Sequence, residues 1–198
     1  VESVHLFSWH RINKKFINKE IEELAFKYID DVDWIESELE KELKTWLSGA
    51  ERVVIVGIGN PIRMDDYVGV KIVQHLQGKV SEKVYLIECE TVPESYIHEI
   101  VNFNPTHILI IDAALLNAKP GEARLFRPDV LENFPSFSTH ILPLRVFCDY
   151  LASTTGAKIA LLLIQPKKTD FGEGLSPELG ASAEKISKIL FAALSQVL

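Results

Sequence analysis

The chain has 198 residues, of which 47% are hydrophobic and 25% are charged, and its formal net charge at pH 7 is −7. This composition is typical of one globular domain with a short appendage, and no run of basic residues exceeds a pair, which argues against a nucleic-acid partner. No apolar stretch reaches the roughly 18 residues that span a bilayer, and no signal-peptide pattern begins the chain, so we expect a cytoplasmic protein without membrane insertion.

Residues 12–48 differ from the rest of the chain, because they are rich in Lys and Glu and lack Gly and Pro. Their apolar residues recur at helical spacing, at Ile35, Leu39, Leu43, Trp46 and Leu47. This pattern predicts one or two amphipathic helices that end at Ser48 and Gly49. We therefore expect an N-terminal helical extension over residues 1–49, whose apolar stripe packs on the main domain or contacts a partner.

Residues 50–198 alternate between short β-branched runs and helical patterns, and are expected to form the main domain. The predicted strands are 53–58, 84–88, 107–111, 122–127 and 158–164, and the predicted helices lie near 66–77, 93–103, 141–153 and 177–198. Thr91 and Glu94 predict a capping box for the second of these helices, with Pro93 in its first turn. Continuous apolar strands alternating with helices predict an α/β fold: a three-layer domain whose twisted, mostly parallel five-stranded sheet is covered by helices on both faces.

Ligands in such folds bind at the carboxyl ends of the strands, and the loop after the first strand is the first place to consider. Gly57 and Gly59 favour a tight turn, but the third glycine of a dinucleotide-binding motif is replaced by Ile62. The loop ends in Asp65 and Asp66, whose charges oppose a bound phosphate. One of them is explained by a helix cap or turn, which leaves the other available as a ligand.

Two further candidates follow later strands. Asp112 ends the apolar run HILIID, where a carboxylate must be hydrogen-bonded, sit in a turn or bind a cation. His140 lies in an uncharged loop before a helix, whereas the other histidines are expected to be structural, and His107 lies too early in its strand to reach the site. If Asp66, Asp112 and His140 converge, two carboxylates and one imidazole suit a divalent transition ion such as Ni(II) or Zn(II).

The residues from Gly57 to Val70 resemble the N-terminal motif of the [NiFe]-hydrogenase maturation endopeptidases: Gly-x-Gly-Asn, four residues, Asp, Asp or Glu, two residues, Gly. The resemblance continues through IIDA at 110–113, KPGE at 119–122 and STHILPLRVFCDYL at 138–151, and it covers about residues 52–198. One difference is Tyr67, where the family often has glycine. We expect this side chain to narrow the site without removing a ligand.

The resemblance implies a protease that removes a C-terminal extension from the precursor of a [NiFe]-hydrogenase large subunit once nickel is in place. By the same resemblance, Asp66, Asp112 and His140 are the metal-binding and catalytic residues. Nickel is then expected to arrive with the substrate, with zinc or cadmium as substitutes in vitro.

Two other functions remain open at this point. One is a nickel-dependent checkpoint that binds the precursor without cleaving it, and the other is a nucleotide-binding enzyme that uses Gly57 and Gly59. A thiol protease is not favoured, because Cys89 and Cys148 are expected to be buried, reduced and inert. The segment 169–179 is expected to form a mobile loop beside the site.

Overall fold

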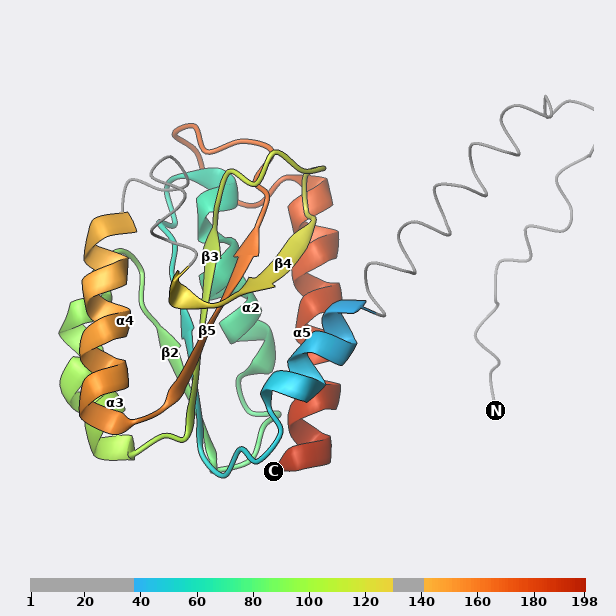
Figure 1. Ribbon diagram of the computed structural model, residues 1–198. Helices are drawn as coiled ribbons and strands as arrows, with labels where there is room; N and C mark the ends of the chain where they lie inside the picture. Colours follow the sequence, from blue (N-terminus) through green and yellow to red (C-terminus); the bar gives the residue numbers. More distant parts are fainter. Residues whose placement is uncertain (1–37, 130–140) are drawn as a thin grey trace, which may run out of the picture. The chain divides into compact units, whose positions relative to one another are not determined.

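The computed structural model describes residues 38–129 and 141–198, and their centre is a five-stranded sheet (Figure 1). The strands are β1 (Val53–Gly57), β2 (Val84–Glu88), β3 (His107–Ala113), β4 (Ala123–Phe126) and β5 (Lys158–Ile164), in the spatial order β2-β1-β3-β5-β4. All neighbouring strands are parallel except β4, which runs antiparallel to β5 at one edge. The predicted mostly parallel sheet is confirmed.

The helices follow the predicted ranges within a few residues. They include η2 (Met64–Tyr67), α2 (Val68–Leu76), η3 (Pro93–Tyr96), α3 (Ile97–Phe103), α4 (Ile141–Thr155) and α5 (Pro177–Val197), where η marks a 3-10 helix. The predicted capping box is wrong: the N-cap of η3 is Val92, and no side chain caps it. Thr91 lies one residue too early, so its spacing from the N-cap is lost, although Pro93 does occupy the first turn.

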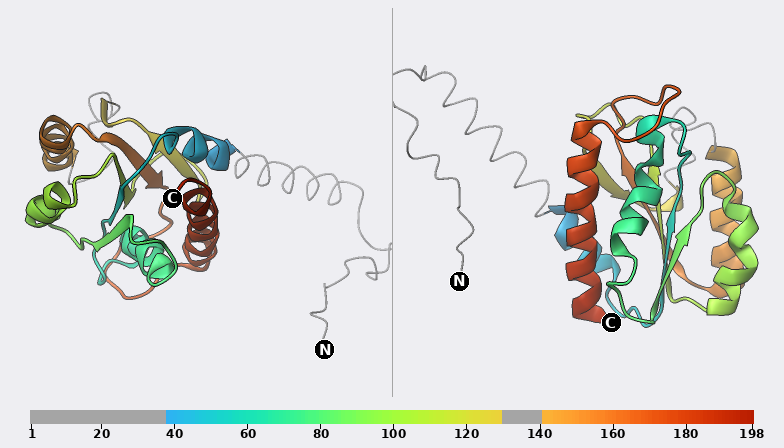
Figure 2. Two further views of the ribbon diagram at one scale, coloured as in Figure 1. Left: turned by 90° about the horizontal axis from the view of Figure 1, so that it is seen from below. Right: turned by 180° about the vertical axis from the view of Figure 1, so that it is seen from behind.

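Helices cover both faces of the sheet, as predicted (Figure 2). In β3, Leu109 and Ile111 pack in one core cluster with residues of α2 and α5. Ile108 and Ile110, which alternate with them, pack in a second cluster with residues of α3 and α4. The strand is buried along its whole length, which explains its continuous apolar sequence.

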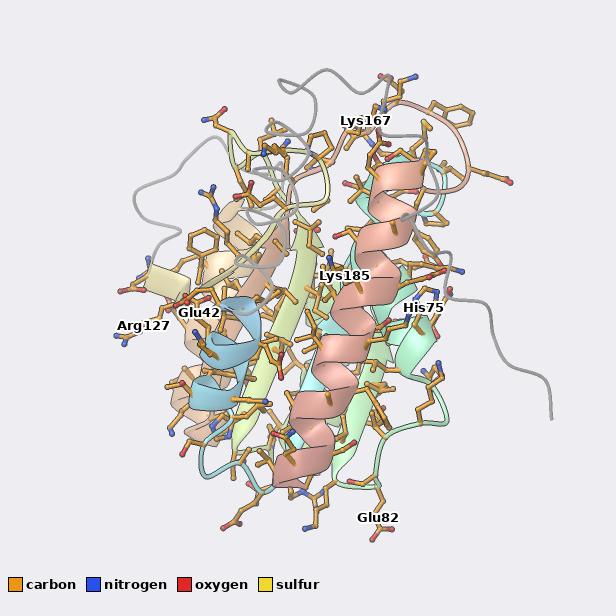
Figure 3. All side chains as sticks on the ribbon, turned by 90° about the vertical axis from the view of Figure 1, so that its right-hand side faces the viewer. Glu42, His75, Glu82, Arg127, Lys167 and Lys185 are labelled. Atoms are coloured by element: carbon orange, nitrogen blue, oxygen red, sulfur yellow. The ribbon has the colours of Figure 1, made fainter. Side chains whose placement is uncertain are left out.

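A helix at residues 38–46 belongs to the first of these clusters. Its residues Leu39 and Leu43, together with Leu47 in the following turn, are buried against the cluster that also contains α5 and α2. Figure 3 looks onto this face, with α5 in front, the helix that carries Glu42 on one side and α2 with His75 on the other. This part of the apolar stripe therefore packs on the main domain, while residues 1–37, Ile35 included, lie outside the described residues.

None of the helices within residues 38–129 and 141–198 combines the length and the apolar character that crossing a membrane requires.

Candidate active site

The strand order places a topological switch point between β1 and β3. After β1 the chain passes through α2 to β2, which pairs with one edge of β1. The next strand, β3, pairs with the opposite edge of β1, and β5 and β4 lie beyond it in the sheet. Ligands of open α/β sheets bind outside the carboxyl ends of the strands at such a point. The residues to consider are therefore those of the site loop, residues 58–66 after β1, and those at the end of β3.

Close backbone contacts fix the site loop. A Cβ added at Gly57 would overlap the carbonyl oxygen of Gly69, and one added at Gly69 would overlap the carbonyl oxygens of Ile58 and Ile111. At Gly59, where φ is 154°, a Cβ would overlap the carbonyl oxygen of Asp66. The loop thus folds back on its own main chain, and the glycines serve this packing. Nothing in this packing favours the nucleotide-binding alternative.

Asp66 lies in η2 and is partly buried. Its Oδ2 accepts a hydrogen bond of 3.0 Å from the N–H of Asn60, and the Oδ1 of Asn60 accepts one of 3.1 Å from the N–H of Ile62. The side chain of Asn60 therefore orders the turn while its main chain orients the carboxylate of Asp66.

Asp112 is buried, with 4% of its surface exposed, at the carboxyl end of β3. Its Oδ1 accepts a hydrogen bond of 2.8 Å from the N–H of Ala113. Burial, followed by the negative charge of Asp66, raises the pKa of Asp112 to about 7, against the opposing effect of the Ala113 N–H. The structure therefore brings two of the three predicted site residues into electrostatic contact.

Such a pair of acids has two chemical uses. In the absence of a cation, Asp112 can hold a proton near pH 7, as a general acid does. A cation would relieve both the burial of Asp112 and its repulsion by Asp66, so the two residues fit a divalent metal.

The predicted third ligand, His140, lies outside the described residues. Within residues 38–129 and 141–198, no group of three or more His, Cys, Asp or Glu side chains is placed to hold a metal ion. The set of Asp66, Asp112 and His140 as metal-binding and catalytic residues stays a prediction.

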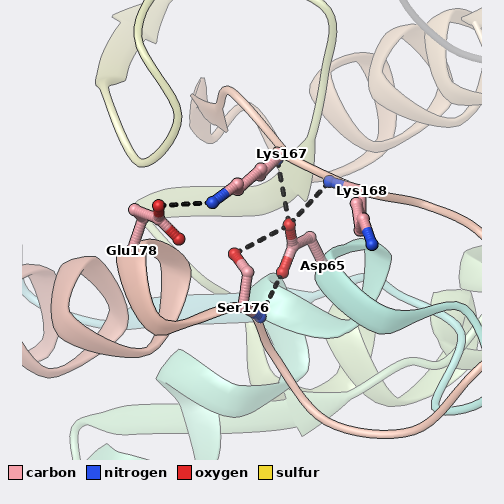
Figure 4. Close-up of polar contacts among 5 residues, drawn as sticks. All are labelled: Asp65, Lys167, Lys168, Ser176 and Glu178. Atoms are coloured by element: carbon pink, nitrogen blue, oxygen red, sulfur yellow. Dashed lines mark hydrogen bonds and ion pairs between the residues drawn. The ribbon is translucent and has the colours of Figure 1, made fainter.

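Asp65 has a role that sequence reasoning missed. It is completely buried, and its carboxylate accepts four hydrogen bonds (Figure 4). Oδ2 accepts from the N–H groups of Lys167 and Lys168, at 2.9 and 2.8 Å, and from the hydroxyl of Ser176 at 3.0 Å. Oδ1 accepts from the N–H of Ser176 at 2.6 Å. The two carboxylates of the DD pair therefore serve different parts of the molecule.

One acid of the pair was expected to cap a helix or to lie in a turn, and Asp65 does lie in the first turn of η2. The helices η2 and α2 have no side-chain cap, and their N-cap residues are Arg63 and Tyr67. The carboxylate instead joins the site loop to both ends of the segment between β5 and α5. We call residues 167–176 the clamped loop.

The clamped loop lies beside the site loop, as expected for this segment. The N–H of Gly172 donates to the carbonyl of Ile62 at 2.9 Å, and the N–H of Met64 donates to the carbonyl of Gly172 at 3.0 Å. Arg63 adds a hydrogen bond of 3.0 Å from Nη2 to the carbonyl of Thr169. The sequence predicts a mobile loop over residues 169–179. Hydrogen bonds to the site loop instead hold this segment, and its last three residues, 177–179, form the start of α5.

Tyr67 points toward α2 and β2. Its hydroxyl accepts a hydrogen bond of 2.9 Å from Nε2 of Gln74, which also donates to Oε2 of Glu88 at 2.9 Å. The ring lines a pocket that also includes Pro61 and Lys71. The tyrosine therefore shapes a neighbouring pocket.

Both cysteines are buried free thiols, as predicted. Burial raises the pKa of Cys89 and that of Cys148 to about 12. Because a thiol is nucleophilic only when ionised, neither is suited to act as a protease nucleophile at neutral pH.

Comparison with known proteins identifies relatives along most of the chain. The family model for hydrogenase maturation proteases matches residues 70–193. A protein of Methanocaldococcus jannaschii named as a hydrogenase maturation protease is 36% identical over 159 residues, which are 76% of this chain and 93% of that protein. The hydrogenase 3 maturation protease of Escherichia coli K12 is 30% identical over 118 residues, 60% of this chain and 75% of that protein.

The fold agrees with these relatives. The crystal structure of the [NiFe] hydrogenase maturation protease HycI from Thermococcus kodakarensis KOD1 superposes with a TM-score of 0.72 at 34% sequence identity, and the match covers 77% of this chain and 98% of that one. The α/β architecture and the resemblance noted from the motifs are both confirmed.

Proposed function

Because the chain belongs to the hydrogenase maturation protease family, it is an endopeptidase, and we propose that it removes the C-terminal extension of a [NiFe]-hydrogenase large-subunit precursor that already holds nickel. The observation that carries this proposal is the pair of Asp66 and Asp112 at the switch point, with the pKa of Asp112 raised to about 7. Two acids that repel each other are the residues expected where a cation has to be recognised.

In this proposal nickel is part of the substrate, and Asp66, Asp112 and His140 are the residues that contact it. Carboxylate and imidazole ligands without a Cys suit a brief contact with a metal that the precursor already binds. When bound, the ion supplies positive charge that polarises a neighbouring carbonyl group.

The two acids have separate tasks in the cleavage. Asp66 is partly exposed and can accept a proton from the attacking water as its oxygen bonds to the scissile carbonyl carbon. Asp112 contacts the cation as an ionised carboxylate, because a bound cation displaces the proton that burial would otherwise retain there. Asp66 then returns its proton to the amide nitrogen as the C–N bond breaks. Each proton taken from water at one carboxylate is thus balanced by one given to the leaving amine.

The proposal is tested by incubating the precursor, with and without nickel, with the wild-type protein or with Asp66→Asn. An asparagine Oδ1 can still accept the N–H of Asn60, so the loop should keep its shape. Intact-mass spectrometry of the precursor should show loss of the C-terminal extension with nickel and wild-type protein, but neither without nickel nor with Asp66→Asn. Asp149→Asn, which changes an exposed acid of α4, is the matched control and should process normally.

A fully active Asp66→Asn protein would contradict the proposed role of this residue. A wild-type protein that binds nickel-loaded precursor and leaves its mass unchanged would favour the checkpoint function instead.

A further inference from the structure

The clamped loop presents Phe171 to solvent with 86% of its surface exposed. The clamped loop is fixed at both of its ends, because Asp65 accepts hydrogen bonds from the N–H groups of Lys167, Lys168 and Ser176. The loop therefore cannot turn Phe171 into the core. The next residue, Gly172, is hydrogen-bonded to the site loop on both its N–H and its carbonyl. The exposure of this aromatic side chain is therefore built into the loop.

Ile62 is the neighbour of Phe171 across this pairing, since its carbonyl accepts the N–H of Gly172. Ile62 is also exposed, to 46%. Two large apolar side chains are thus held on adjacent strands of main chain, and one of these strands continues to Asp66. Adjacent exposed apolar side chains, unlike single ones, are a feature of interaction sites when they form a contiguous surface.

A pocket of about 280 Å³ lies between the two loops. Pro61, Ile62, Tyr67 and Leu175 form its apolar lining, and Lys71 and Glu173 contribute one positive and one negative charge. The volume lies at the lower limit of the range of about 300 to 1,000 Å³ that is typical of small-molecule sites, so it suits a small group such as an amino-acid side chain. Because the two charges cancel, the pocket does not select an ionic ligand.

We propose that Phe171, Ile62 and this pocket form a docking surface for an apolar side chain of the precursor polypeptide beside the cleavage site. The inference rests on the proposed function, because a polypeptide that brings its scissile bond to Asp66 must pass close to the loop that carries Ile62. Lys71 and Glu173 at the pocket suit the polar main chain on either side of an apolar side chain.

The hydrogen bonds of Asp65 to the clamped loop favour binding of the precursor at this surface. An aromatic side chain whose loop is already ordered loses little conformational freedom on binding, and aromatic anchors of this kind carry much of the energy of protein interfaces. Asp65 thus links recognition to chemistry, because it holds the clamped loop while its neighbour in the chain, Asp66, enters the active site.

The test compares Phe171→Ser with Phe191→Ser in processing assays at several concentrations of nickel-loaded precursor. Phe191 is the matched control, because it is a phenylalanine with 41% exposure on α5. We expect Phe171→Ser to raise KM about tenfold with kcat unchanged, Ile62→Ser to raise it by a smaller factor, and Phe191→Ser to leave both constants unchanged. Phe171→Leu, which keeps an apolar side chain, should restore most of the affinity.

The outcomes separate this inference from the proposed function. If the wild-type protein processes the precursor and Phe171→Ser does so with the same KM, the docking surface is wrong and the function stands. If the wild-type protein binds the precursor without cleaving it and Phe171→Ser weakens that binding about tenfold, the docking surface stands and the cleavage is wrong. If sedimentation shows a dimer that Phe171→Ser dissociates while KM is unchanged, the occupant is a second copy and the inference is overturned.

Discussion

Asp66 and Asp112 interact through their charges across the carboxyl ends of β1 and β3, and this repulsion adds to burial in raising the pKa of Asp112 to about 7. The relationship can be measured directly. Asp66→Asn removes one negative charge and should lower the pKa of Asp112 while leaving it above 3.8, because burial remains the larger cause. Carboxyl-carbon NMR titration measures this shift, and an unchanged pKa would contradict the coupling.

The raised pKa of Asp112 also predicts how stability depends on pH. The folded protein binds a proton at this site up to about pH 7, whereas an unfolded Asp releases it near 3.8, so the free energy of unfolding should fall as pH rises between these values. Asp112→Asn lacks the buried charge and should be more stable than wild type at about pH 8, by about 4 kcal/mol, with no advantage near pH 4.

Urea unfolding of Asp112→Asn and wild type at several pH values measures that difference. Asp149→Asn, at an exposed position, should show no such dependence on pH. A stability difference for Asp112→Asn that is constant from pH 4 to pH 8 would show that this carboxyl titrates normally.

The clamp at Asp65 predicts a large stability effect from a small change. Asp65→Ala leaves buried N–H groups without an acceptor and should lower the free energy of unfolding by about 3 kcal/mol. Asp65→Asn should also destabilise the folded protein. Both oxygens of Asp65 accept hydrogen bonds from N–H groups, so the NH₂ group of an asparagine would face a donor on whichever side it occupied. Ser176→Ala removes only the hydroxyl donor and should cost about 1 kcal/mol.

Chemical denaturation of these variants and of the double variant Asp65→Ala/Ser176→Ala tests the clamp. The effects should be less than additive, because the hydroxyl of Ser176 has no partner once Asp65 is gone. Additive losses would mean that the two residues act independently.

Glycine substitutions should distinguish close packing from simple chain flexibility. Gly59→Ala places a methyl group against the carbonyl oxygen of Asp66, so it should displace Asp66, destabilise the fold and lower kcat at least tenfold. Gly180→Ala is the matched control, because a Cβ in α5 meets nothing within 4 Å there and should stabilise the helix by about 0.5 to 1 kcal/mol. Thermal unfolding and processing assays give both readouts, and equal behaviour of the two variants would contradict the packing argument.

The thiols should be dispensable. Because burial raises the pKa of Cys89 and of Cys148 to about 12, native protein should react slowly with iodoacetamide at pH 7.5, and denatured protein rapidly. The double variant Cys89→Ser/Cys148→Ser should keep its processing activity wherever it folds. Rapid inactivation by iodoacetamide would reopen the thiol mechanism.

Strand positions could be predicted from the sequence because burial on both faces leaves a continuous apolar run. β3 nevertheless extends two residues beyond the predicted range, since Asp112 and Ala113 pair with Leu163 and Ile164 through their main chain, which does not depend on side-chain polarity. The helix ranges also follow from periodicity. The start of η3 does not, because the true N-cap is Val92, the residue directly after Thr91.

The candidate site was predictable in part. Chemistry and motif spacing select Asp66 and Asp112, whose charges interact in the structure, and their role in the site stays a prediction. The role of Asp65 could not be predicted, because its donors lie more than a hundred residues later and are mainly main-chain N–H groups, which every residue except proline carries. The exposure of Phe171 depends on the same contacts, so it could not be predicted from the sequence either.

Three of the four donors to Asp65 belong to the main chain, and this has a consequence for how such a protein can diversify. Most side chains along residues 167–175 can change without altering the hydrogen bonds that set the loop's shape. The conditions are that no proline removes an N–H from position 167, 168 or 172 and that glycine stays at 174, where φ is 79°. A fixed scaffold with interchangeable contact residues is a means by which related enzymes can keep one reaction and acquire different substrates.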